Sequence, residues 1–413
     1  MSEGAVNLLE TEILIAGGGM VGLSLAVALA RVGVEVMVVD REPPEARTDS
    51  SFDGRSSAIA HGSRRILEGI GLWPAMAGAA EPILDIRVSD GRIGRPASPL
   101  FLHFDHRAVG SPFGHIVENT VIRRALSTAV ADCGALRYLA PAGLVHAERN
   151  GKDAAATLAD GRHVRARLLV AADGRDSPLR DGAGIASARW SYPQTGIVAT
   201  VGHELPHQGV AHEHFLPAGP FAMLPMTGQR SSIVWTERAT LAPAMMALDP
   251  QSFAGEIERR FGPSLGRIHL IGRRWSYALS FIHAARYTDT RMALIGDAAH
   301  AIHPIAGQGL NLGLQDVAAL AEAIVDAVRL GLDPGGHTVL AAYERRRRLD
   351  NLAVAAVTDG LNRLFSNDIA PVRLARDLGL GLVDRIPPLK RFFMLTAMGG
   401  MGELSRLARR EAL

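Results

Sequence analysis

The longest uncharged stretch of the chain, residues 13–30, consists of apolar side chains interrupted by four glycines. A short apolar run that ends in glycines and continues into a longer apolar run is typical of a buried strand, a tight turn and a helix. We therefore predict a strand at 12–16, a helix at 23–31 and a second strand at 34–39.

Hydropathy alone would also fit a signal peptide or a membrane helix at 13–30. Glu3, Glu10 and Glu12 precede the stretch, where a signal peptide needs basic residues, and the glycines interrupt any uniform helix. No other stretch is long and apolar enough to span a bilayer. We expect a cytoplasmic protein, with peripheral contact with the inner membrane left open.

A second strand, glycine loop and helix are predicted late in the chain. An apolar run at 292–295 ends in Gly296-Asp297, a loop follows, and a helix begins at about Leu310. A glycine-rich loop before a helix offers unpaired backbone N–H groups to an anion or an electron-rich ring oxygen. A connection without a ligand would explain the glycines, but not the Asp and the Pro-x-x-Gly-x-Gly-x-Asn loop together.

Between about residues 185 and 282 the pattern changes to alternation typical of antiparallel strands, at 212–216, 221–225 and 231–236. A strand at 83–89 is expected to join them, and residues 92–112 are expected to be irregular. Asp160-Gly161 between apolar runs predicts a hairpin at 154–158 and 163–170. The fold class is therefore α/β (α+β overall), with a Rossmann-like part and an antiparallel sheet.

Composition changes this picture little. The chain has 413 residues, of which 47% are hydrophobic and 21% charged, which is enough for a large core in two interleaved domains. Its one cysteine, Cys133, excludes an internal disulfide, and a net charge of +2 gives no reason to expect nucleic acid as a partner. The four arginines at 345–348 spread around a helix axis, so we predict a solvated face there.

The first glycine turn has the spacing of a dinucleotide site. Gly17, Gly19 and Gly22 form a GxGxxG pattern between a strand and a helix, and Asp40 follows 18 residues after Gly22. The glycines allow a pyrophosphate to approach the helix N-terminus, and the acid can accept hydrogen bonds from ribose hydroxyls. An acid at this place disfavours a 2′-phosphate, so FAD and NAD remain as candidates and NADP does not.

The later loop, His303-Pro304-Ile-Ala-Gly307-Gln-Gly309-Leu310-Asn311, closely resembles a flavin motif of the FAD-dependent aromatic hydroxylases, the group of p-hydroxybenzoate hydroxylase. Within that group it is most similar to the ubiquinone-biosynthesis hydroxylases. Residues 358–365 and 387–394 resemble the same subgroup, so the resemblance covers almost the whole chain. It implies that Asp297 contacts the ribityl and pyrophosphate part of FAD, and that the loop lies against the isoalloxazine ring.

The resemblance also assigns cofactor contacts elsewhere. Arg55 stands in the family's D-x-R pattern, Asp173 in its Asp-Gly motif, and Asn119 and Arg124 on its cofactor-contacting helix, where the family has Gln in place of Asn119. The predicted cofactor-binding residues are Gly17, Gly19, Gly22, Asp40, Arg41, Arg55, Asn119, Arg124, Asp173, Asp297, Pro304, Gly307, Gly309, Leu310 and Asn311.

The domain limits follow from these motifs. We assign 1–76, 105–184 and 285–345 to a Rossmann-like FAD-binding domain. Residues 77–104 and 185–284 form the antiparallel-sheet substrate domain. Residues 346–413 form a C-terminal helical region.

No Ser-His-Asp nucleophile arrangement, metal cluster or cysteine pair is evident, so the chemistry must belong to the cofactor. We assign no catalytic residue, and we treat the pairs His103/His106 and His212/His214 as structural rather than metal-binding. The resemblance implies an FAD-dependent monooxygenase in which NAD(P)H reduces the flavin and O₂ forms a C4a-hydroperoxide. It would hydroxylate a polyprenylated phenol of ubiquinone biosynthesis. A ferredoxin-type electron donor stays open.

Two alternatives remain open. The same flavin fold supports prenyl reductases and other aromatic hydroxylases, and a flavin-binding, non-catalytic subunit of a biosynthetic complex would carry the same motifs. From Lys390 onward five basic residues outweigh two acidic ones beside apolar side chains. That composition suits contact with anionic lipid or with a partner subunit, and it equally suits ordinary packing of a terminal helix.

Overall fold

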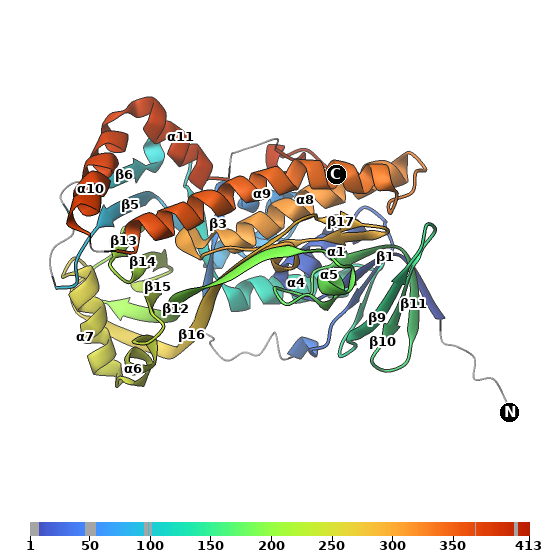
Figure 1. Ribbon diagram of the computed structural model, residues 1–413, viewed down its shortest axis with the longest axis horizontal. Helices are drawn as coiled ribbons and strands as arrows, with labels where there is room; N and C mark the ends of the chain where they lie inside the picture. Colours follow the sequence, from blue (N-terminus) through green and yellow to red (C-terminus); the bar gives the residue numbers. More distant parts are fainter. Residues whose placement is uncertain (1–7, 46–54, 95–97, 99–100, 368, 400–403) are drawn as a thin grey trace.

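Two large sheets organise the computed structural model, which describes residues 8–45, 55–94, 98, 101–367, 369–399 and 404–413 (Figure 1). Asp53 of the D-x-R pattern and Met401 and Glu403 of the basic C-terminal segment lie outside these residues. The predicted fold class is confirmed, since a mainly parallel sheet with helices is combined with a long antiparallel sheet.

The first sheet has the strand order β17-β18-β11-β1-β2-β8. Its strands are β1 (Leu8–Ala16), β2 (Val36–Val39), β8 (Leu136–Leu139), β11 (His163–Ala171), β17 (Thr288–Asp289) and β18 (Met292–Leu294). The strands β18, β11, β1, β2 and β8 pair in parallel, whereas the short β17 is antiparallel to β18. Strand β10 (Ala154–Leu158) pairs antiparallel with β11, which confirms the hairpin predicted at 154–158 and 163–170. Strand β9 (Leu144–Arg149) pairs in turn with β10.

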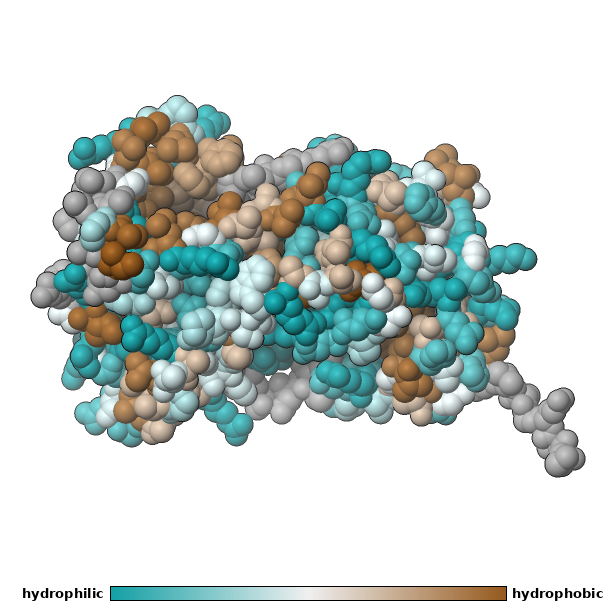
Figure 2. Space-filling view, viewed as in Figure 1, coloured by the Kyte–Doolittle hydropathy of each residue, from teal (hydrophilic) through white to brown (hydrophobic). Residues whose placement is uncertain are grey.

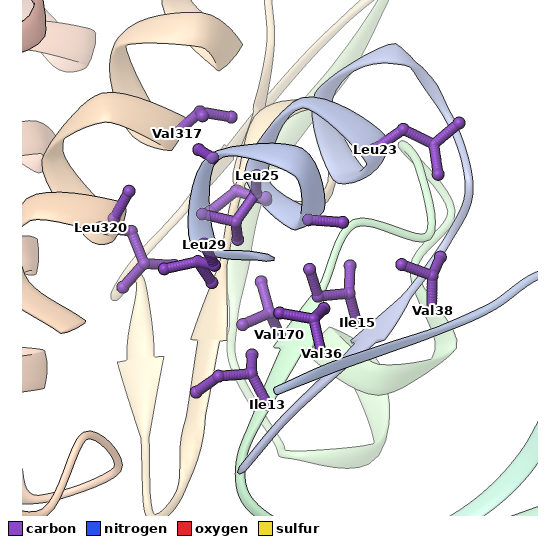
Figure 3. Packing of buried hydrophobic residues seen from close by; sticks show 14 of the residues in the cluster. Ile13, Ile15, Leu23, Leu25, Leu29, Val36, Val38, Val170, Val317 and Leu320 are labelled. Carbon is purple, nitrogen blue, oxygen red and sulfur yellow. The ribbon is translucent and has the colours of Figure 1, made fainter. Parts of the chain in front are cut away.

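Helix α1 (Met20–Ala30) is buried between this sheet and helix α8 (Gln308–Arg329). Figure 3 shows its Leu25 and Leu29 between the side chains of Ile13 on β1 and Leu320 on α8. Because both sides of α1 are covered by apolar groups, the uncharged stretch 13–30 is explained as a core strand, turn and helix. None of the helices in the described part of the chain has the length and apolarity needed to cross a bilayer.

The second sheet has the order β19-β16-β12-β15-β14-β13-β5-β6. Its strands are β5 (Asp85–Asp90), β6 (Leu102–Asp105), β12 (Ser187–His203), β13 (Val210–Leu216), β14 (Gly219–Met226), β15 (Arg230–Arg238), β16 (Ile268–Ala284) and β19 (His300–Ala301). The long antiparallel strands β12 and β16 extend from beside the first sheet toward α6 and α7 (Figure 1). Helices α6 (Ala242–Ala247) and α7 (Pro250–Phe261) cover one face of it.

Of two sequence predictions in this region, one was wrong and the other is confirmed in part. The segment 92–112, expected to be irregular, contains β6, whose Leu102 and Phe104 are buried against other apolar side chains. The strand expected at 83–89 is divided, because β4 (Glu81–Ile83) joins a separate sheet with β3 (Ser56–Ala60) and β7 (Gly114–Glu118). Only β5 belongs to the second sheet, where it pairs in parallel with β13.

The remaining helices are α3 (His61–Gly69), α4 (Asn119–Asp132), α5 (Pro178–Gly182), α9 (His337–Phe365), α10 (Ala370–Arg385) and α11 (Pro387–Ala397). The long α9 lies beside α8, and α10 and α11 close the end of the molecule that holds β5 and β6 (Figure 1). The last segment, 404–413, packs instead on α3, and Arg406 pairs with Glu322 and Asp326 of α8. Its basic residues therefore do not lie together with the apolar residues of α11.

Candidate flavin site

The predicted cofactor residues follow four parallel strands of the first sheet. Gly17 follows β1, Asp40 follows β2, Asp173 lies after β11 and Asp297 lies after β18. Because the carboxyl ends of parallel strands meet at one edge of a sheet, these residues share the edge at which ligands bind in open α/β sheets.

The first glycine turn is held by close backbone contacts. Gly17 has a φ of +114°, and a Cβ there would lie 2.2 Å from the carbonyl oxygen of Ala172. A Cβ on Gly22 would lie 2.1 Å from the carbonyl oxygen of Gly17. Helix α1, which begins after Gly19, has neither a capping side chain nor an acidic residue in its first turn. Its N-terminal end is therefore suited to an anionic group.

Asp40 lies against this turn. Its side chain is 4% exposed, its Oδ2 accepts a hydrogen bond from the Gly18 amide, and its Oδ1 accepts one from the Glu42 amide at 2.8 Å. The neighbouring Arg41 is exposed. The acid that the GxGxxG spacing predicts is therefore beside the glycines, whereas Arg41 faces solvent.

The Asp-Gly segment after β11 approaches the motif after β18. The Oδ2 of Asp173 accepts a hydrogen bond from the Leu179 amide at 3.3 Å, whereas its Oδ1 has no hydrogen-bond partner among the described residues. Burial raises the pKa of the Asp173 carboxyl group. Two residues on, the Arg175 guanidinium lies 3.9 Å from a carboxylate oxygen of Asp297. Both side chains of this pair are about half exposed, which leaves Asp297 accessible to a ligand.

The loop before α8 is tied to β3. Gly307 has a φ of +60°, and a Cβ on it would lie 3.0 Å from the Ala58 methyl group. The Asn311 side chain donates to the carbonyl oxygens of Ala58 at 2.8 Å and of Gly307 at 3.1 Å, and it accepts from the Ala60 amide at 2.9 Å. These bonds fix the path of the loop, so Asn311 supports the loop rather than projecting from it. Pro304 and Leu310 are half-buried.

Gly309 differs from the other glycines of the site. Its φ is not in the left-handed region, and a Cβ there would meet no atom within 4 Å. The protein itself therefore does not require glycine at this position. Like α1, helix α8 begins without a capping side chain and without an acidic residue in its first turn.

Arg55 and Asn119 lie together at the start of β3. The Asn119 amide donates to the Arg55 carbonyl oxygen at 3.0 Å, and the Asn119 side-chain oxygen accepts from Ser57 at 2.7 Å. The Arg55 guanidinium lies 5.4 Å from the centre of the Trp275 ring. Arg124, farther along α4, is exposed and makes none of these contacts.

A buried polar cluster behind the loop was not predicted from the sequence. Asp316 of α8 accepts hydrogen bonds from the Gly296 amide at 3.0 Å, from Arg347 Nε at 2.9 Å and from Asn351 at 3.1 Å, and it lies 2.6 Å from His300 Nε2. Burial by itself raises the pKa of Asp316, but His300 and Arg347 outweigh it and lower the pKa to about 2. The cluster therefore fixes the Gly296-Asp297 turn from behind.

Arg347 also corrects the prediction for the four-arginine run. Arg345 is exposed, and Arg346 and Arg348 are half-buried. Arg347, by contrast, is 4% exposed and hydrogen-bonded to Asp316. The run does spread around the helix axis, as predicted, yet one of its members points into the protein. Four consecutive arginines give no sequence signal that shows which of them is buried.

His303, which begins the loop, is a second residue that the sequence did not single out. Its side chain is fully buried, neither ring nitrogen has a hydrogen-bond partner among the described residues, and its ring makes an edge contact with Tyr192 at 5.2 Å. Burial lowers its pKa to about 4, so the imidazole is neutral near pH 7. It can donate or accept one hydrogen bond to a group that enters the loop region.

FAD fits this set of residues. The two uncapped helix starts offer backbone N–H groups, one behind the glycine turn for a pyrophosphate and one at the loop for ring oxygens. Gly309 leaves open space on the loop, and the half-exposed Asp297 carboxylate is accessible at the same edge.

Comparison with known proteins decides the family. The FAD binding domain family matches residues 10–358. The chain belongs to this family. The ubiquinone hydroxylase UbiL of Rhodospirillum rubrum is 55% identical over 388 residues, covering 94% of this chain and 89% of the relative. The 3-demethoxyubiquinol 3-hydroxylase of Escherichia coli K12 is 34% identical, covering 94% and 98%.

The family also accounts for the fold. The crystal structure of p-nitrophenol 4-monooxygenase PnpA from Pseudomonas putida DLL-E4 superposes with a TM-score of 0.79 at 18% identity, covering 96% of this chain and all of that one. The prediction of an FAD-dependent aromatic hydroxylase is thereby confirmed, and so is FAD as its cofactor. The individual cofactor contacts stay predictions, to which the geometry above gives positions.

The histidine pairs were predicted to be structural. His212 and His214 lie on one face of β13, where both rings contact Phe261, and His214 is bonded to Ser89 at 2.6 Å. In the described part of the chain, Asp85, Asp105 and His106 bring three possible metal ligands together. Asp105 already binds Arg107 in a two-point ion pair, so this group carries no metal assignment.

Proposed function

We propose that this protein is an FAD-dependent monooxygenase that hydroxylates the aromatic ring of a polyprenylated phenol in ubiquinone biosynthesis. The observation that carries the proposal is the convergence of the two glycine turns and the Asp173 segment at one edge of the first sheet. The 55% identity to a ubiquinone hydroxylase over 94% of the chain supports the choice of substrate class.

The cofactor contacts are assigned by position. The turn at Gly17, Gly19 and Gly22 and the start of α1 hold the pyrophosphate, and Asp40 holds the ribose. Asp297 holds the ribityl chain. The start of α8, from Gly307 to Asn311, presents its N–H groups to the ring system. We assign Arg55, Asn119 and Asp173 to the same site, and Arg41 and Arg124 to its solvent side.

Bound FAD supplies the activation of O₂, with NAD(P)H as the reductant, and no residue of this chain replaces that chemistry. The chain's own residues bind and orient the phenol and exclude water. The apolar face of the second sheet that meets the loop suits this task, since Phe215, Ile305 and Phe365 pack together there. N–H groups at the start of α8 stabilise negative charge that develops on the ring system.

The direct test is isotopic. The purified protein is loaded with FAD and supplied with NADH or NADPH, ¹⁸O₂ and a phenol that carries a short prenyl chain. The proposal predicts substrate-stimulated oxidation of the reductant and one ¹⁸O atom in the product. Saturation of a prenyl double bond would identify a prenyl reductase instead, and flavin binding without any turnover would identify a non-catalytic subunit.

We also propose that the end of the molecule formed by α10 and α11 touches the membrane surface, with the enzyme on its cytoplasmic side. Figure 2 shows hydrophobic side chains gathered there. The exposed apolar residues of the two helices are Leu382, Ile386, Leu389, Phe392, Phe393 and Leu395. Exposed Arg385 and Arg391 stand among them, which suits an anionic lipid surface.

Flotation with anionic and neutral vesicles tests this contact. Binding to anionic vesicles that is lost in Phe392→Ser/Phe393→Ser supports it. Equal behaviour of that variant and the wild type contradicts it, and capture of a partner subunit that the same variant abolishes would assign the surface to a biosynthetic complex.

A further inference from the structure

Glu213 stands in the middle of β13, in the face of the second sheet that looks toward the flavin loop. Alternation along a strand places Ala211, Glu213 and Phe215 on one face and His212 and His214 on the other. The histidine face is covered by Phe261 of α7. Glu213 therefore points away from α7, to the side that carries Ala211 and Phe215.

Both flanking residues contact the surroundings of the loop. Phe215 packs in one apolar cluster with Ile305, which follows Pro304 in the loop. Ala211 belongs to a second cluster, against which Ala58 packs, and the Ala58 carbonyl oxygen is a partner of Asn311. The Glu213 side chain thus lies between two groups of residues that contact or support the loop assigned to the flavin ring.

The neighbours across the sheet are apolar. Glu213 pairs with Ala222 on β14 and with Val88 on β5, and Leu224 lies on the same face two residues from Ala222. Helices α9 and α10 contribute Phe365 and Leu380 to the clusters on this side. A carboxyl group in the middle of such a surface is unusual, because burying it without a partner costs free energy.

Several charged side chains that the structure describes on the surrounding elements are joined in pairs. These pairs are Asp90–Arg376 at 2.9 Å, Asp359–Arg363 at 2.8 Å, Asp384–Lys390 at 2.7 Å, Glu118–Arg230 at 2.9 Å and Asp85–His103 at 3.3 Å. His303 of the loop is neutral near pH 7. The Glu213 side chain has neither an ion pair nor a hydrogen bond among the residues that the structure describes, and burial is the one influence on its carboxyl group.

Burial raises the pKa of Glu213 to about 8, yet the side chain keeps part of its accessible surface and is only half-buried. The carboxyl group is therefore surrounded by apolar side chains and still partly accessible to a bound molecule. A carboxyl group with a pKa near the working pH is suited to exchange a proton with a bound molecule.

We propose that Glu213 binds the ring hydroxyl group of the phenol substrate and accepts its proton, which makes it a catalytic residue for the reaction proposed above. The proposal rests on that reaction, because it needs a phenol on the flavin side of the sheet. In the step, the O–H bond of the ring hydroxyl breaks, its proton passes to a Glu213 carboxylate oxygen, and the bonding electron pair stays on the phenolic oxygen. The ring becomes richer in electrons, as attack on an oxygen donor requires.

The variants for the test are Glu213→Gln, which keeps size and hydrogen bonding but cannot take the proton, and Glu213→Asp, which keeps the carboxyl group. His212→Gln is the matched control, because it lies on the same strand and faces α7. FAD content is measured in all of them. The substrate is the short-chain prenylphenol used above.

In the wild type, kcat/KM is expected to rise as the pH increases through about 8, because only the carboxylate can accept a proton. Glu213→Gln is expected to bind FAD normally, to lose about 100-fold in kcat, to lose this pH dependence, and to release peroxide in place of product. Glu213→Asp should recover part of the rate, and His212→Gln should behave as the wild type. A Glu213→Gln variant with the pH profile and product yield of the wild type would overturn the proposal.

An equilibrium measurement separates this inference from the reaction itself. The prenylphenol and its methyl ether are titrated into the FAD-loaded protein, and binding is followed by the flavin absorbance. At pH 9 the phenol should bind the wild type more tightly than Glu213→Gln, whereas the methyl ether should bind both equally. If the substitution changes the affinity for both ligands equally, Glu213 does not contact the hydroxyl group. This outcome is independent of whether the protein hydroxylates phenols.

Discussion

The side-chain oxygen of Asn311 accepts a hydrogen bond from the backbone amide of Ala60 at 2.9 Å, although 251 residues separate the two in the sequence. Through this bond the loop before α8 is fixed to β3 independently of any ligand. Some loop residues are therefore required by the protein's own packing, and others are required only if a cofactor binds there.

Gly307 and Gly309 separate these two contributions. Gly307→Ala places a Cβ in left-handed backbone, at a cost of about 1–2 kcal/mol, and 3.0 Å from Ala58. Gly309→Ala meets no protein atom and should stabilise the apoprotein slightly, by up to about 1 kcal/mol. We expect Gly307→Ala to lower the melting temperature of the apoprotein, and Gly309→Ala to weaken FAD binding only. Unchanged FAD affinity in Gly309→Ala would place the ring elsewhere.

Asp297 should be required for the cofactor. Its side chain is half exposed and lies near Arg175, so its removal leaves no buried group unpaired. We expect Asp297→Ala to keep the fold and to lose FAD, measured as flavin absorbance per polypeptide after gel filtration. Asp176→Ala, another exposed acid near the same turn, is the control and should keep FAD. Full flavin content in Asp297→Ala would count against the assignment.

The buried pair of Asp316 and Arg347 should dominate the stability of this region. Removing one partner leaves a buried charge uncompensated, so Arg347→Gln is expected to cost about 3–5 kcal/mol of unfolding free energy in chemical denaturation. Arg345→Gln, at an exposed position of the same run, should change it by less than about 0.5 kcal/mol. Similar values for the two variants would disprove the role given to the cluster.

The pH dependence of stability should reveal Glu213 without any substrate. Its pKa is raised from 4.5 to about 8 on folding, so its contribution to stability is present below pH 4.5 and is lost as the pH rises through about 8. Glu213→Gln removes this loss. Its melting temperature should therefore exceed that of the wild type by a margin that grows from pH 5 to pH 8. A constant margin across this range would mean that the carboxyl group titrates normally.

The motifs with fixed spacing could be predicted from the sequence. Gly17, Gly22 and Gly307 are dictated by close contacts or by positive φ, and such requirements leave a local pattern that can be read. The alternation in part of the second sheet is equally local, and the strands predicted at 212–216, 221–225 and 231–236 correspond to β13, β14 and β15. These features depend on neighbours within a few positions of the chain.

What the sequence did not reveal depends on distant partners. Arg347 is buried because it pairs with Asp316, which lies 31 residues earlier in the chain. No feature of the run 345–348 distinguishes Arg347 from its neighbours. Glu213 faces the flavin loop because α7 covers the opposite face of β13, which only the packed sheet establishes. The division of 83–89 between two sheets likewise follows from the pairing of β4 with β7.

Hydrogen exchange of the apoprotein and the FAD-loaded protein shows whether the separated segments converge on one cofactor. We expect FAD to protect residues 17–22, 173–179 and 296–311 together and to leave the β9–β10 hairpin unchanged. A protein that takes up no FAD, or one in which bound FAD protects only one of the three segments, would contradict this expectation.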